Sequence, residues 1–260
     1  MGTKKQEKRL KEKFYKDLSF VNSPDARTVR ILSEYYGPYR RFRQMKIKDT
    51  IVFFGSARIP SPENKNNPKN QGTAQLVDYY ENARKLSYKL TKWSKGLKNS
   101  SHRFIITSGG GGGIMEAASR GAKEADGYSI GLNISLPFES AGNPYTTEKL
   151  DFEFHYFFMR KYWFLYLAKA LVVFPGGFGT LDELMELLTL IQTGKIKKKL
   201  PVVVYDSKFW KNVINFDYMV KMGTISKEDL DLFHFSDSVN DAYKFLTKEL
   251  TKTHLAGKNF

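Results

Sequence analysis

The 260-residue chain contains no cysteine, which excludes disulfide bonds, thiolate metal sites and cysteine nucleophiles. Histidine is scarce, and no histidine stands at a metal-ligand spacing from a carboxylate or from another histidine. We therefore expect no metal site built by the protein. The four histidines are His102, His155, His234 and His254.

Long apolar runs are missing as well. No stretch reaches the roughly 18 apolar residues that a membrane helix needs, and no apolar run follows the lysine-rich N-terminus as it would in a signal peptide. We expect a cytoplasmic protein with no membrane partner. The apolar content of 41% is nonetheless enough for a sizeable core at this length.

Acidic residues are outnumbered by basic ones, and the formal net charge is +15. Such an excess is typical of proteins that bind nucleic acids. The distribution argues against that partner, because the cations gather in residues 1–13, where Glu7 and Glu12 lie among them, and in the 195–199 segment. We interpret them as solvated surface charge with a general attraction for anions.

The hydrophobic pattern divides the chain into a basic, weakly ordered extension, residues 1–20, and a single nucleotide-binding α/β domain, residues 21–260. The domain opens with an amphipathic helix over 24–45. Short apolar runs then alternate with helical patterns, which predicts a Rossmann-like doubly wound parallel sheet flanked by helices. Strands are expected at 51–54, 104–107, 128–134, 152–158, 171–174, 201–205 and 232–235, and helices at 76–93, 114–126, 159–169, 181–192 and near the C-terminus.

Two glycine-rich loops each join a predicted strand to a predicted helix, at 109–113 and at 175–180. Without Cβ atoms, several backbone N–H groups can converge on one anion, and the helix that follows adds its unpaired donors and positive dipole. A single loop of this kind is equally consistent with a tight turn, but two in this context favour phosphate binding. The expected substrate or phosphate contacts are Ser56, Gly109, Gly110, Gly111, Gly112, Gly113, Glu116, Lys161, Gly176, Gly177, Gly179 and Thr180.

Other phosphate-binding signatures fail on inspection. A dinucleotide motif G-x-G-x-x-G would need a third glycine where Ile114 or Asp182 stands. A P-loop is excluded because Gly194 and Lys195 are followed by Ile196. We therefore expect a mononucleotide as the ligand and no redox cofactor.

The segment from Pro175 to Glu183 reads P-G-G-F-G-T-L-D-E, and Met159-Arg160-Lys161 stands just upstream. Here the chain resembles the Lonely Guy family, phosphoribohydrolases that activate cytokinins, together with bacterial relatives that hydrolyse nucleoside monophosphates. Further matches to the longer bacterial branch lie at 55–58, 109–116, 136–139 and 143–145, so the resemblance spans about residues 25–245. The chain departs from it mildly, with Gly112 where many relatives have proline and Ser108 where threonine is usual.

The resemblance implies hydrolysis of the N-glycosidic bond of a nucleoside 5′-monophosphate, with AMP or a cytokinin riboside monophosphate as substrate, to free base and ribose 5-phosphate. It implies no cofactor, a homodimer, and Arg160 and Glu183 as the catalytic pair. Glu183 would stabilise the ribosyl cation and orient or activate water, since such bonds break through an oxocarbenium-like state. Arg160 would hold the phosphate or stabilise the leaving base. A structural ion pair is the alternative role for the two residues.

A second function stays open from the sequence. Proteins that resemble this family carry a nucleotide-like cofactor without turnover, and the same loops would serve such a non-catalytic carrier. The intact Arg160 and Glu183 favour the enzyme. Relatives have often been labelled lysine decarboxylases, but no pyridoxal-binding constellation accompanies Lys161 or Lys169.

Overall fold

Seven short strands form one fully parallel sheet in the order β4-β3-β2-β1-β5-β6-β7. The computed structural model describes residues 12–67, 72–97, 102–135 and 142–255. The strands are Thr50–Phe54 (β1), Ile105–Ser108 (β2), Ser129–Ile134 (β3), Asp151–Phe154 (β4), Ala168–Val173 (β5), Val202–Tyr205 (β6) and His234–Ser236 (β7).

The α-helices are Leu18–Val21 (α1), Arg27–Gln44 (α2), Val77–Lys95 (α3), Ile114–Glu124 (α4), Phe157–Tyr166 (α5), Phe178–Gln192 (α6), Ser207–Val213 (α7), Phe216–Lys221 (α8) and Val239–His254 (α9). Short 3₁₀ turns lie at Phe14–Lys16 (η1), Pro24–Ala26 (η2), Pro62–Asn64 (η3), Ala74–Leu76 (η5), Glu148–Leu150 (η6) and Glu228–Leu232 (η7).

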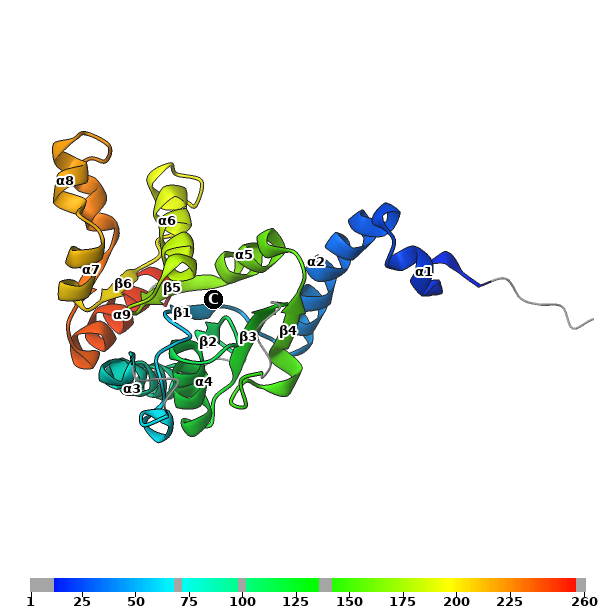
Figure 1. Ribbon diagram of the computed structural model, residues 1–260, viewed down its shortest axis with the longest axis horizontal. Coiled ribbons are helices and arrows are strands. Elements are labelled where there is room, and N and C mark those ends of the chain that lie inside the picture. The colour runs from blue at the N-terminus through cyan, green and yellow to red at the C-terminus, as the bar shows by residue number, and fades with distance from the viewer. Residues whose placement is uncertain (1–11, 68–71, 98–101, 136–141, 256–260) are drawn as a thin grey trace, which may run out of the picture.

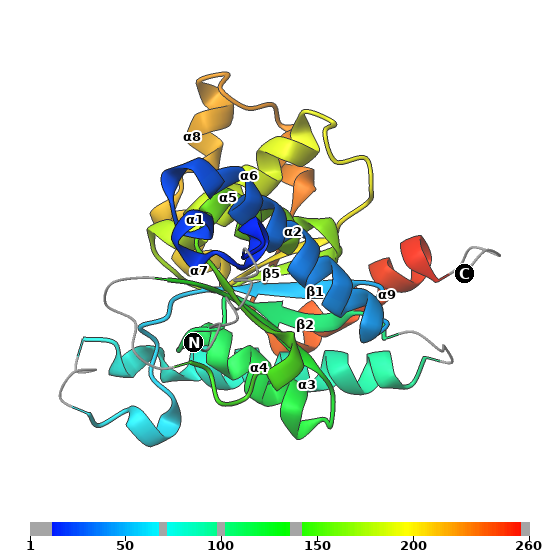
Figure 2. The ribbon, with the colours of Figure 1, turned by 90° about the vertical axis from the view of Figure 1, so that its right-hand side faces the viewer.

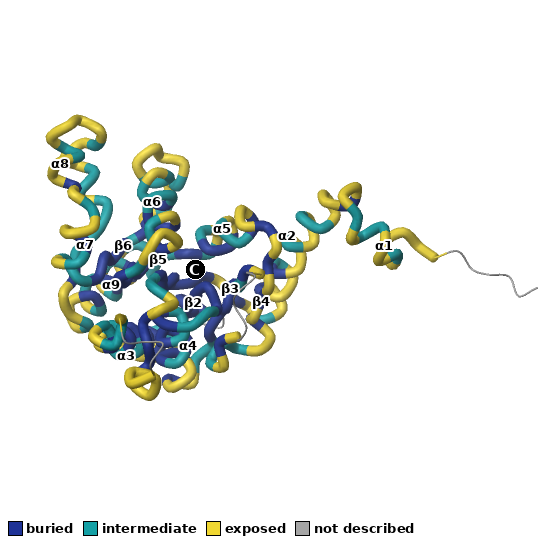
Figure 3. Tube along the Cα trace, viewed as in Figure 1, coloured by how far each residue is buried: buried dark blue, intermediate teal, exposed yellow. Residues whose placement is uncertain are grey.

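Helices cover both faces of the sheet, so the central strands are apolar on both sides. Val52 and Phe54 of β1 pack with α2, α5, α6 and α7, whereas Ile51 and Phe53 pack with α3, α4 and α9. Figures 1 and 2 show these two helical layers on either side of the sheet. Figure 3 shows that the strands between them are buried almost throughout. The predicted Rossmann-like fold is thus confirmed.

The strand order reverses at β1, which pairs with β2 on one side and with β5 on the other. In doubly wound sheets, ligands bind outside the carboxyl ends of the strands at such a reversal. The loops that follow β1, β2 and β5 therefore frame the candidate site.

Glu34 of helix α2 hydrogen-bonds to the body of the protein. Its carboxylate accepts the backbone N–H groups of His155 (2.8 Å) and Tyr156 (3.2 Å), and its carbonyl accepts the indole N–H of Trp163 (3.0 Å). The first two contacts lie just before α5 and the third lies within it, so together they tie α2 to α5. Beyond α2, helix α1 extends away from the sheet (Figure 1). Residues 1–11 lie outside the described residues, so the weakly ordered extension and its boundary at residue 20 remain predictions.

The predicted boundaries between residues 152 and 169 were wrong. The strand expected over 152–158 ends at Phe154, the helix expected over 159–169 runs from Phe157 to Tyr166, and Lys169 belongs to β5. Aromatic residues favour strands by propensity, which extended the expected strand too far. The helix is instead determined by burial, because Met159, Trp163 and Phe164 recur at helical spacing and all face the core.

Candidate functional site

The second glycine loop forms a tight turn between β5 and α6. A Cβ atom on Gly176 would lie 2.1 Å from the Thr180 hydroxyl oxygen, so the turn tolerates no side chain there. Helix α6 begins at Phe178, three residues before the expected Leu181, which places Gly179 and Thr180 in its first turn. Among the described residues, no side chain caps this end. Its N–H groups and positive dipole therefore face the cleft and suit an anion.

Arg160 of α5 and Glu183 of α6 line the same cleft as this helix terminus. The cleft has a volume of about 780 Å³ and opens where the strand order reverses. Of the twelve expected binding residues, six line it: Ser56, Gly109, Gly176, Gly177, Gly179 and Thr180. Its other walls include Phe54, Gly55, Ala57, Arg58, Met115, Ile134, Phe157, Phe164, Leu181, Asp182 and Val213.

The Arg160 side chain is held from two sides. Its Nε donates a hydrogen bond of 2.7 Å to the Leu132 carbonyl, and its guanidinium carbon lies 5.1 Å from the centre of the Phe164 ring. The first glycine loop comes close as well, since a Cβ atom on Gly109 would lie 2.5 Å from an Arg160 terminal nitrogen. The guanidinium therefore sits against both the loop after β2 and the wall of the cleft.

Glu183 is a buried carboxyl group, with 7% of its surface exposed. Burial raises the pKa of Glu183 to about 7, against the opposing influence of Lys161 and Arg160. The nearby acidic groups Glu186 and Asp182 raise the pKa further. A carboxylate with a pKa near neutrality can exchange protons at physiological pH, as a general base must.

The first glycine run packs against protein rather than lining the cleft, apart from Gly109. Gly110 and Gly113 have positive φ angles of 74° and 62°. A Cβ atom would lie 2.1 Å from the Asn133 side-chain oxygen at Gly110, and 2.2 Å from the Ser56 carbonyl oxygen at Gly113. Gly111 and Gly112 are half-buried and are not among the residues described as lining the cleft.

Ser56 connects the two glycine loops through its backbone. Its N–H donates to the Pro175 carbonyl (3.0 Å), and its carbonyl accepts the N–H of Ile114 (3.1 Å) at the start of α4. The Ser56 hydroxyl accepts the N–H of Arg58 at 3.1 Å. The run after β2 thus positions Ser56, which in turn is fixed to the loop after β5.

Glu116 and Lys161 point elsewhere. The Tyr80 hydroxyl donates to Glu116 at 2.6 Å, which places this carboxylate between α3 and α4. Lys161 pairs with Asp182 and Glu186 of α6 and lines a neighbouring groove rather than the cleft. The structure therefore does not place either group in the cleft where the sequence led us to expect a substrate contact.

Sequence reasoning missed the apolar wall formed by Met115, Ile134, Phe157 and Phe164. Two of these four residues could have been predicted, because Phe157 and Phe164 stand three residues before and four residues after Arg160. That spacing places all three on one face of a helix that begins at Phe157. Ile134 and the Leu132 carbonyl carried no signal, since only the fold brings β3 to the cleft.

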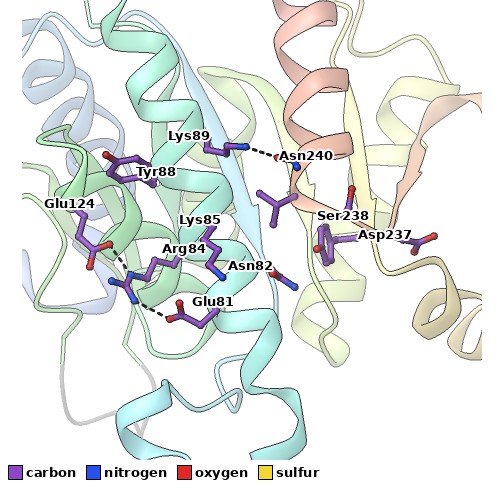
Figure 4. A pocket seen from close by; sticks show the side chains of 12 residues that line it. Glu81, Asn82, Arg84, Lys85, Tyr88, Lys89, Glu124, Asp237, Ser238 and Asn240 are labelled. Atoms are coloured by element: carbon purple, nitrogen blue, oxygen red, sulfur yellow. Dashed lines mark hydrogen bonds and ion pairs between the residues drawn. The ribbon is translucent and has the colours of Figure 1, made fainter.

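A second cleft, of about 710 Å³, lies between α3 and α9 (Figure 4). Several of its charged and polar groups are paired: Arg84 with Glu81 and Glu124, and Lys89 with Asn240. Neither glycine loop reaches it. It therefore lacks the features that mark the first cleft as an anion site.

No group of three or more histidine, aspartate or glutamate side chains within the described residues could hold a metal ion. No helix in the described part of the chain is long and apolar enough to cross a membrane. The residues at 136–139, which the resemblance includes, lie outside the described residues.

Residues 115–246, just over half of the chain, match the family described as Possible lysine decarboxylase. The chain belongs to this family. Family members with curated names include the rice "Probable cytokinin riboside 5'-monophosphate phosphoribohydrolase LOG4", which is 27% identical over 147 residues covering 55% of this chain and 62% of the relative. LOG7 of Arabidopsis thaliana, a cytokinin riboside 5'-monophosphate phosphoribohydrolase, is 28% identical over 55% of this chain and 66% of its own length. The family resemblance is confirmed, although each match spans less than two thirds of these relatives.

Two solved structures are similar to the chain. The X-ray structure of TM1055 is 20% identical, with a TM-score of 0.51 and coverage of 77% of this chain and 99% of TM1055. The Moco carrier protein from Chlamydomonas reinhardtii is 20% identical, with a TM-score of 0.49 over 79% of this chain and 99% of the carrier. The likeness to TM1055 supports the α/β fold.

Proposed function

We propose that the protein hydrolyses the N-glycosidic bond of nucleoside 5′-monophosphates to free base and ribose 5-phosphate, with AMP or a cytokinin riboside monophosphate as substrate. One observation carries this proposal. Arg160 and a buried Glu183 with a pKa near 7 come from different helices and line one cleft with the uncapped N-terminus of α6. The names of the plant relatives support the same reaction.

The cleft suggests how a mononucleotide would lie. The phosphate would meet the N–H groups at Gly177 and the Thr180 hydroxyl, because a helix N-terminus favours anions. Glu183 stands one helical turn after Thr180 on α6, so a phosphate bound at the terminus would bring the ribose near its carboxyl group. The base would then rest against Ile134 and Phe157 on the opposite wall.

The reaction follows from this placement. The bond between C1′ and the base nitrogen breaks, and its electron pair leaves with the base while positive charge develops on the ribose. The Glu183 carboxylate stabilises that charge and accepts one proton from the attacking water. The water oxygen bonds to C1′ and keeps its second proton, and the proton held by Glu183 reaches the base. Arg160 stabilises the negative charge that develops opposite Glu183.

The test is chromatography of a panel of nucleoside monophosphates after incubation with the wild-type protein and with Glu183→Gln. We expect free base and ribose 5-phosphate from the wild type, and a rate at least 100-fold lower from the variant, in line with the loss of a catalytic base. Tight binding without release of base from any monophosphate would instead establish the carrier function. Absence of both binding and release would overturn the proposal.

We also propose that the protein is a homodimer, assembled through an aromatic face on α2 and α5. Tyr36 (60%), Phe158 (51%), Tyr162 (37%) and Tyr166 (47%) are exposed, and Tyr35 lies against both Tyr36 and Tyr162. Exposed apolar patches of this kind mark interaction surfaces. Light scattering should give twice the chain mass, and a monomer at micromolar concentration would contradict the proposal.

Phe158→Asp should yield the monomer, because it places a charge on this exposed aromatic face. Tyr218→Asp is the matched control, since Tyr218 is 55% exposed on α8, away from α2 and α5.

A further inference from the structure

Lys161 follows Arg160 on α5 but serves a different surface. Its Nζ lies 2.8 Å from the Asp182 carboxylate and 2.7 Å from the Glu186 carboxylate, and only 18% of its side chain is exposed. The two acids are the residues one before and three after Glu183 on α6. A single lysine on the helix that carries Arg160 therefore binds the helix that carries Glu183 at two residues, one before and one after Glu183 in the sequence.

Resting on the proposed function, we propose that Lys161 is a positioning residue, which holds Glu183 opposite Arg160 and controls its charge without touching the substrate. Adjacent helix positions are turned by about 100° from one another, so Arg160 points into the cleft while Lys161 points toward α6. The strand β5 separates α5 from α6 in the chain, and the Lys161 bridge joins the two helices directly beside the site.

The Lys161 bridge also affects the charge of Glu183, because its three members are all charged groups close to that carboxyl. From α5, the cations Lys161 and Arg160 lower the pKa of Glu183, whereas Glu186 and Asp182 on its own helix raise it. From the loop after β1, Arg58 lines the same cleft. Removing Lys161 takes away a cation and leaves two acids without their partner. Removing Glu186 does the opposite, since it deletes an anion and leaves Lys161 beside Glu183.

These two changes should therefore move the activity profile in opposite directions. The measurement is kcat/KM between pH 5 and 9 for the wild type, Lys161→Gln, Lys161→Arg and Glu186→Gln. For Lys161→Gln we expect the acid limb to move up by about one pH unit, so that kcat/KM at pH 6 falls about tenfold. For Glu186→Gln the limb should move down. Lys161→Arg should keep most of the wild-type profile, because the guanidinium fork still reaches both acids.

The control is Lys89→Gln. Lys89 also bridges two helices, with its Nζ 2.6 Å from the Asn240 side chain (Figure 4), but it lies in the cleft between α3 and α9, away from the site. Its profile should match the wild type. If Lys161→Gln and Glu186→Gln both lose activity equally at every pH, the bridge is merely structural and the proposal is overturned.

A second readout does not depend on turnover. The side-chain ¹³C carboxyl signal of Glu183, identified by its absence in Glu183→Gln, can be titrated in the ligand-free protein. We expect its midpoint to rise in Lys161→Gln and to fall in Glu186→Gln. If these shifts occur while the wild type cleaves no monophosphate, the proposed function fails but the control of Glu183 by Lys161 stands. If the midpoint is unchanged in both variants, the inference fails whatever the activity.

Discussion

Glu183→Gln should make the folded protein more stable at neutral pH while it removes the proposed activity. Burial raises the pKa of Glu183 from 4.5 to about 7. When the folded-state pKa lies above the unfolded one, the folded state binds the proton more tightly. The protonated group therefore contributes stability that is complete below about pH 4.5 and is lost as the pH rises through 7. Above that pH the wild type retains a buried charge that the variant lacks.

The size of the effect follows from the two pKa values. A difference of one unit between the folded and unfolded pKa is worth about 1.4 kcal/mol. The free energy of unfolding of the wild type therefore falls by about 3 kcal/mol between pH 4.5 and pH 8 through this one carboxyl group. The amide of the variant also has a burial cost, of about 1–2 kcal/mol where it finds no partner. That cost does not change with pH. The test is therefore the pH dependence of the difference, not its value at one pH.

The assay is urea denaturation of wild type and variant at pH 5 and pH 8. We expect the free energy of unfolding of the variant, relative to wild type, to increase by about 2–3 kcal/mol between the two pH values. Glu228→Gln, at an exposed carboxylate in η7, should show no such increase. A difference that stays constant from pH 5 to pH 8 would refute the reasoning, because it would mean that Glu183 ionises as freely in the folded protein as in the unfolded one.

Two further predictions concern the glycine turn and the core. Gly176→Ala should weaken mononucleotide binding at least tenfold by calorimetry, because its Cβ would lie 2.1 Å from the Thr180 hydroxyl oxygen, whereas Gly177→Ala should weaken binding far less because nothing lies within 4 Å of its Cβ. Asp49→Asn should lower the free energy of unfolding by about 3–5 kcal/mol in urea, since it leaves the buried guanidinium of Arg103, 2.6 Å away, without its counter-charge. Equal binding by the two alanine variants, or a loss below 1 kcal/mol in Asp49→Asn, would contradict these expectations.

The sheet could be predicted from sequence because parallel strands that are buried on both faces consist of short continuous apolar runs, such as those of β1 and β5. The segment from Phe152 to Lys169 could not be divided correctly. Its aromatic residues favour a strand by propensity, and the core that makes part of it a helix is assembled from distant segments.

The glycines show a similar limit. Sequence reveals that Gly110 and Gly113 allow a positive φ, but not whether a ligand or the protein itself occupies the space that their missing Cβ atoms leave. In this fold the Asn133 side chain and the Ser56 carbonyl take that space. Both belong to segments that approach the loop only because β1 and β3 flank β2. The second loop was predicted better, since Gly176, Gly177 and Thr180 all line the cleft together with Glu183.

Lys161 illustrates why a charge beside a motif is hard to interpret from sequence. It was among the expected substrate or phosphate contacts, yet it stands one step along the helix from Arg160, which turns its side chain by about 100° from that of Arg160. Its ammonium group is committed to two carboxylates, and a phosphate would have to displace both of them to bind it. Under the proposed function, the substrate phosphate would be neutralised by the α6 terminus and by Arg58, an exposed cation that lines the cleft together with Arg160. Lys161 is left to act on the charge of Glu183 instead.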